Sequence, residues 1–96
     1  MRVQFKEDDP KGIVEKIQQQ LGGRKLGDML DFNLQKDSLV VTIKKLGTST
    51  LKFNINGKEW VLAEEKIALA HKAFKGEMME KLSGVISKVG GKIVEA

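Results

Sequence analysis

The chain has no cysteine and no tyrosine, and it has one histidine, His71. Without cysteine it can form no disulfide, no thiolate nucleophile and no cysteine-ligated metal site. A single imidazole cannot make a cluster of metal ligands, and it leaves little for general acid–base chemistry. These absences argue against an enzyme, and the sequence indicates no catalytic, cofactor-binding or metal-binding residue.

Long apolar runs are absent too. None approaches the roughly 18 residues that span a bilayer, so we expect no transmembrane segment. Residues 1–9 lack the apolar core of a secretory signal, so we expect a cytoplasmic protein. The length of 96 residues fits one α+β domain, residues 1–96.

Arginine is scarce although the chain is basic. Lysine and arginine together number 17 against 13 acidic residues, for a net charge of +4, but only Arg2 and Arg24 are arginine. Arginine is the usual bidentate reader of phosphates and guanine edges, so its scarcity disfavours nucleic acid as a partner. The lysine excess is expected to keep the surface soluble.

The first residues predict a short strand and then a helix. Apolar and polar residues alternate over residues 3–5, as in a strand. Asp9 can cap a helix whose first residue is Pro10, because its carboxylate accepts hydrogen bonds from free N–H groups. Apolar residues then recur at spacings of three and four up to Leu21, and Gly22 and Gly23 supply a stop.

The middle of the chain predicts four strands. Apolar and polar residues alternate over residues 30–35, 39–44, 50–55 and 58–62, which is typical of an antiparallel sheet covered on one face. Asn56 and Gly57 predict a two-residue type I′ hairpin. That turn would place Phe53 directly opposite Trp60.

The last third predicts a long helix. One apolar stripe runs at helical spacing from residue 67 to residue 89. Gly84 falls on this stripe, where a missing side chain would allow close approach to the sheet. Residues 63–66 fit either the start of this helix or an extension of the fifth strand. Ile93 and Val94 are too few to assign.

The element order is therefore β-α-β-β-β-β-α. It predicts an α+β fold, with an antiparallel meander sheet of four to five strands. One face of the sheet would be covered by the long C-terminal helix and the shorter N-terminal helix. The predicted structural core contains Phe32, Phe53, Trp60, His71, Phe74 and Met78.

His71 lies within the apolar stripe, so we interpret it as a structural residue, with a buried acid–base group as the alternative. Leu69 and Met79 fall off the stripe, and methionine suits adaptable contacts. Together with Lys72 they form a candidate partner surface, although scattered apolar residues are normal on any surface.

A nucleic-acid function is the alternative. An α-β-β-β-α run occurs in double-stranded-RNA-binding domains, which recognise A-form shape with lysines at the start of the last helix. Here Glu64 and Glu65 occupy that start and would repel phosphate. The polar sheet face also lacks an aromatic residue for base stacking.

One predicted strand ends in Lys44, Lys45, Leu46 and Gly47, and residues 50–53 follow in the next. This strand–turn–strand is similar to one in the polyhydroxyalkanoic acid system protein family, which residues 38–88 resemble. Residues 67–76 look like its apolar run leading into a Phe-Lys-Gly helix, which residues 77–82 continue. Leu46 departs from the pattern, because a small polar residue is expected there.

The resemblance implies a cytoplasmic, bacterial, non-catalytic accessory or binding protein associated with storage-polymer granules. It implies an unknown protein or the granule surface as the partner. It supplies no catalytic residue and no cofactor.

Overall fold

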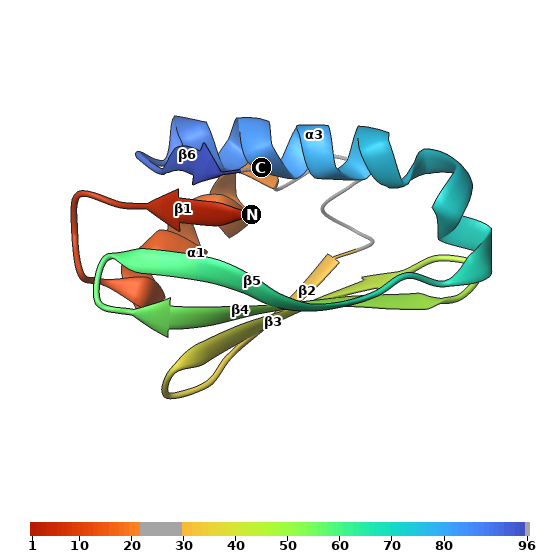
Figure 1. Ribbon diagram of the computed structural model, residues 1–96, viewed down its shortest axis with the longest axis horizontal. Coiled ribbons are helices and arrows are strands. Elements are labelled where there is room, and N and C mark those ends of the chain that lie inside the picture. Colours follow the sequence, from red (N-terminus) through yellow and green to blue (C-terminus); the bar gives the residue numbers. More distant parts are fainter. Residues whose placement is uncertain (22–29, 96) are drawn as a thin grey trace.

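A computed structural model describes residues 1–21 and 30–95, which form an α+β fold with a six-stranded antiparallel sheet and two α-helices (Figure 1). The elements in chain order are β1 (Arg2–Gln4), α1 (Pro10–Leu21), β2 (Leu30–Leu34), β3 (Ser38–Lys44), β4 (Thr48–Asn56), β5 (Glu59–Lys66), the 3₁₀ helix η1 (Leu69–Phe74), α3 (Lys75–Lys88) and β6 (Lys92–Glu95). The stop predicted at Gly22 and Gly23, and Arg24, lie outside the described residues.

The predicted meander is confirmed, and the sheet is wider than expected. Its strand order is β2-β3-β4-β5-β1-β6, and it is not closed into a barrel. Val3 of β1 lies opposite Trp60 of β5 on one side and opposite Ile93 of β6 on the other. The expectation of four to five strands was too low, because β6 is too short to show a pattern in sequence. It forms by pairing with β1.

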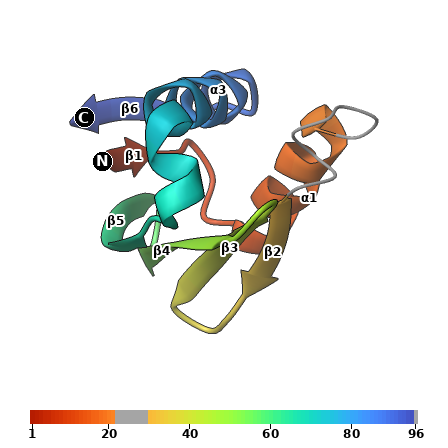
Figure 2. The same ribbon diagram turned by 90° about the vertical axis from the view of Figure 1, so that its right-hand side faces the viewer.

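Both helices lie on the same side of the curved sheet (Figure 2). Asp9 caps α1 as predicted, since its Oδ1 accepts a hydrogen bond from the Gly12 N–H at 3.2 Å. Ile13, Ile17 and Leu21 bury the apolar stripe of this helix, which lies against β2 and α3. The helix-facing side of the sheet therefore holds the core.

The β4–β5 hairpin differs from the prediction by two positions in register. Asn56 pairs with Glu59, so Gly57 and Lys58 form the two-residue loop. Gly57 has a φ of 62°, as at the first central position of a type II′ turn, which reserves that position for glycine. Trp60 consequently lies opposite Ile55 rather than Phe53. The shift of two keeps Phe53 and Trp60 on one face, with ring centroids 6.5 Å apart.

The predicted continuous helix over residues 67–89 is also corrected. β5 extends to Lys66, which settles the open assignment of residues 63–66 in favour of the strand. In this extension Glu64 lies opposite Lys52, and such opposite charges favour pairing across strands. The chain then forms η1 before α3 begins at Lys75. Apolar periodicity did not separate the 3₁₀ helix from an α-helix, because over only six residues repeats of about 3.0 and 3.6 place similar positions on one face.

Trp60 lies at the centre of the buried core. Its ring centroid is 4.7 Å from that of Phe5, in a tilted arrangement that aromatic pairs favour. Phe53, Trp60, His71 and Met78 are buried, whereas Phe32 and Phe74 are half-buried and packed against the same cluster. Gly84 is exposed, and a Cβ built there meets nothing within 4 Å, so the expected close approach to the sheet does not occur.

We predict that Trp60→Ala lowers the free energy of unfolding by about 3–5 kcal/mol, enough to unfold most of a domain of this size. Urea denaturation followed by circular dichroism measures the change. Trp60→Phe is the control and should cost less, because it keeps a ring beside Phe5. It also removes an indole N–H that has no hydrogen-bond partner among the described residues. Equal losses in the two variants would contradict the proposed packing.

Candidate functional site

One corner of the molecule joins two segments that are distant in sequence. The turn between β3 and β4, residues 45–47, lies at the same end of the long axis as η1 (Figure 1). Ser49 begins the helix-facing positions of β4, two residues before the buried Leu51, so its side chain points into the fold. His71, in the middle of η1, faces it.

Three hydrogen bonds join the two segments. Ser49 Oγ and His71 Nδ1 are 2.5 Å apart, and His71 Nε2 lies 2.5 Å from the Lys45 carbonyl oxygen. The Ala68 N–H donates to Ser49 Oγ at 2.8 Å. The bond from Ala68 satisfies a backbone donor just before η1, where no side chain of η1 itself supplies a cap.

The partners assign the protons of this network. A carbonyl oxygen can only accept, so His71 Nε2 carries the hydrogen and donates it to Lys45. In the neutral imidazole Nδ1 then accepts, and the Ser49 hydroxyl donates to it. Ser49 Oγ still has a lone pair for the Ala68 N–H. Every polar atom of the two side chains is therefore used.

A serine beside an imidazole is also the pairing that activates a nucleophile. Ser49 and His71 are both 0% exposed, so no substrate atom reaches Oγ in this structure. The group that orients the ring is a backbone carbonyl, whereas hydrolytic triads use a carboxylate or an amide. The geometry therefore fits a structural link between the turn and η1. We call this link the pin: the side chains of Ser49 and His71 with their hydrogen bonds to the backbone of Lys45 and Ala68.

The turn held by this pin displays an unusual leucine. Leu46 has a φ of 56°, in the left-handed region that costs a bulky residue of order 1–3 kcal/mol. Leu46 is nevertheless 86% exposed, so its side chain buries little surface that could offset the strain. Gly47 follows with a φ of 139°, and a Cβ there would lie 3.1 Å from the Ala68 Cβ. Glycine at this position lets the turn pack against the start of η1.

Leu69 lies beside this turn. The neighbours of Leu46 on both sides, Lys45 and Gly47, touch His71 and Ala68, which flank Leu69 in the chain. Leu69 is 84% exposed. The large hydrophobic residues that stand out as exposed in the described chain are Leu46, Leu69 and, at 43%, Val94. The two most exposed of them therefore share one corner.

Two lysines accompany the leucines. Lys45 and Lys72 are exposed, and neither forms an ion pair within the described ranges 1–21 and 30–95. Residues 45–48 and 68–73 contain no carboxylate. We call the group Lys45, Leu46, Leu69 and Lys72 the leucine corner.

The candidate partner surface is divided by the structure. Leu69 and Lys72 belong to the leucine corner, whereas Met79 lies on α3 and is half-buried against the core. The sequence analysis did not place Ser49 or Leu46 in a candidate site, although it noted Leu46 as a departure from the family pattern. Leu46 carried a usable signal, because a leucine next to a glycine in a polar turn breaks the expected turn chemistry. Ser49 carried none, since one serine in an alternating strand does not reveal its partner.

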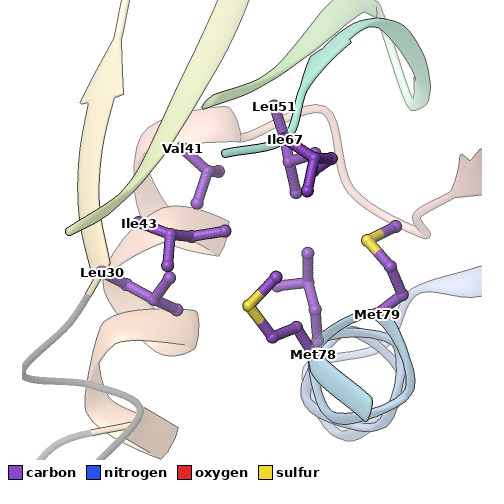
Figure 3. Close-up of a pocket in the computed structure, with 8 residues that line it drawn as sticks. Leu30, Val41, Ile43, Leu51, Ile67, Met78 and Met79 are labelled. Carbon is purple, nitrogen blue, oxygen red and sulfur yellow. The ribbon is translucent and has the colours of Figure 1, made fainter. Parts of the chain in front are cut away.

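Met79 instead helps to line a small cavity between α3 and the sheet (Figure 3). The cavity measures about 10 Å³, and its lining is wholly apolar: Leu30, Val41, Ile43, Leu51, Ile67, Met78, Met79 and Leu82. This volume is close to the least that holds one water molecule, and a water would find no polar partner there. The cavity is therefore a packing gap of the core in this structure.

Residues 1–21 and 30–95 show neither a cluster of metal ligands nor a membrane-spanning helix. They contain no group of three or more histidine, cysteine, aspartate or glutamate side chains placed to hold a metal ion. Within the same part of the chain, no helix is both long and apolar enough to cross a membrane.

We predict that Ser49→Ala lowers the free energy of unfolding by about 2–4 kcal/mol, because the Ala68 N–H and His71 Nδ1 both lose their partner in a buried site. Thr48→Ala, at the adjacent exposed position, should stay within about 0.5 kcal/mol of the unsubstituted protein. Urea denaturation of both variants checks this. Similar small losses in the two would contradict the role of the pin.

Comparisons with known proteins add no relative. No family model matches the chain, and searches of curated proteins and of solved structures return no significant match. The resemblance to the polyhydroxyalkanoic acid system proteins therefore rests on the residues that carry it.

Proposed function

We propose that this chain is a non-catalytic accessory or binding protein of the bacterial cytoplasm that associates with storage-polymer granules. It would act in the manner that its resemblance to the polyhydroxyalkanoic acid system family implies. Its task would be to dock through the leucine corner, and it would need no cofactor.

The observation that carries this proposal is that the two stretches on which the family resemblance depends contact each other in the fold. The resemblance depends on two stretches, Lys44 to Gly47 and Ile67 to Gly76. In the fold these stretches are joined by the bond from His71 to Lys45 and by the contact between Gly47 and Ala68. Because the two stretches contact each other in the fold, the residues of one depend on the residues of the other, which gives a reason for both to occur in one protein.

The buried pin supports a non-catalytic role. The lone imidazole has both ring nitrogens engaged and none of its surface exposed. General acid–base catalysis needs a group within reach of the substrate, and His71 offers none in this arrangement. What the corner does expose is apolar and cationic surface, and such surface serves binding.

The test is the distribution of the protein in a bacterium that accumulates storage polymer. We expect the tagged protein to sediment with granules in a density gradient, and the double variant Leu46→Ser, Leu69→Ser to remain in the soluble fraction. Both positions are exposed, so serine should leave the fold intact, as circular dichroism would check.

Val94→Ser is the matched control, because Val94 is an exposed apolar residue on β6, away from the corner. It should sediment as the unsubstituted protein does. Absence of the unsubstituted protein from the granule fraction would contradict the proposal. Loss of sedimentation after ribonuclease treatment would contradict it in favour of the RNA-binding alternative.

A further inference from the structure

We propose that the leucine corner inserts into an anionic phospholipid surface, with Leu46 and Leu69 entering the acyl boundary and Lys45 and Lys72 contacting the headgroups. This inference rests on the proposed function and names the chemistry of the surface to which the protein docks.

The shape of the corner favours insertion. The β3–β4 turn and η1 form one end of the longest axis of the molecule (Figure 1), which measures 35 Å. Leu46 in the turn and Leu69 in η1 are both almost fully exposed. A fluid acyl layer can close around exposed leucines at such an end, whereas a protein partner would need a preformed pocket to bury the same leucine surface.

The charge of the corner favours an anionic surface. Lys45 and Lys72 are exposed beside the leucines, and the two segments bring no carboxylate with them. Neighbouring lysines are already engaged, since Lys44 pairs with Asp31 and Lys75 with Glu65. The charge of Lys45 and Lys72 is therefore available to phosphate headgroups.

The strain at Leu46 favours a functional role for this side chain. Asparagine or glycine adopts a positive φ more easily than leucine does. The tight turn from Lys44 to Thr48 accounts for the positive φ at Leu46, but it does not account for an exposed leucine side chain there. Such local conflicts occur where a site has been shaped for binding.

The buried pin makes the corner ready to bind. The bonds from Ser49 and Lys45 to His71 fix the turn against η1 before any partner arrives. Little ordering of the chain is then required on docking. Because only two leucines insert, the binding should be weak and reversible, as with other peripheral anchors of small apolar area.

The experiment is co-sedimentation of the full chain with vesicles. Equal mixtures of phosphatidylglycerol and phosphatidylcholine provide the anionic surface, and pure phosphatidylcholine provides the neutral one. We expect binding to the anionic vesicles, weakened by salt, and at least about 10-fold weaker binding to the neutral ones. Leu46→Ser with Leu69→Ser should reduce affinity for anionic vesicles by about 100-fold or more.

Leu46→Asn separates binding from folding. It relieves the strained φ, so its melting temperature should equal or exceed that of the unsubstituted chain, while its vesicle affinity falls about 10-fold or more. Val94→Ser should bind as the unsubstituted chain does. Equal affinity of the Leu46→Asn variant and the unsubstituted chain, or no binding to anionic vesicles at all, would overturn the inference.

The two proposals can fail separately. Sedimentation with granules but not with vesicles would overturn the lipid contact and indicate a granule protein as the partner. Binding to vesicles without sedimentation with granules would support the lipid contact and overturn the granule function.

Discussion

The hydrogen bonds of His71 are the constraint on which the architecture of this corner depends. The ring is fully buried, and its two nitrogens reach a side chain in β4 and a carbonyl in the β3–β4 turn. A buried polar ring is costly unless both nitrogens are satisfied, so the turn and η1 must keep one relative position. The short 3₁₀ turn before α3 places the ring where both partners can be met.

The pin holds a turn whose residue Leu46 breaks two general preferences of folded chains: glycine or asparagine at a positive φ, and burial of large apolar side chains. Elsewhere the chain follows such preferences, since the core is apolar, Asp9 caps α1, and glycine takes the positive φ at Gly57. At Leu46 a bulky apolar side chain is both strained and exposed. The buried Trp60 indole N–H, which has no partner among the described residues, is a further departure, but it lies in the core, whereas Leu46 lies at the surface where a partner can reach it.

Much of the fold followed from periodicity, and the corrections have definite causes. Alternation placed the strands of the meander, and the Asp9–Pro10 signal placed the start of α1, because both depend on local chemistry. The hairpin register failed because Asn56 and Gly57 also fit a turn in which only the glycine has positive φ. β6 was missed because four residues carry no period, and it is held by pairing with β1.

The candidate site was predictable only in part. Leu69 stood out from the sequence because it falls off the apolar stripe, and Lys72 was grouped with it as part of a candidate partner surface. Met79 also falls off that stripe, but it lines the core cavity. Residues 69–74 form a 3₁₀ helix and α3 begins only at Lys75, which changes the face on which later residues lie. The link between Ser49 and His71 was hidden because it joins residues 22 positions apart through tertiary structure alone.

The central claim is that Leu46 and Leu69 leave water when the protein docks. Because the chain has no cysteine, Leu46→Cys, Leu69→Cys and Val94→Cys variants can each carry one polarity-sensitive fluorophore. On addition of vesicles containing phosphatidylglycerol, the emission from positions 46 and 69 should shift to the blue, while that from position 94 stays unchanged. Bound protein whose emission shifts at position 94 but not at 46 or 69 would contradict the account.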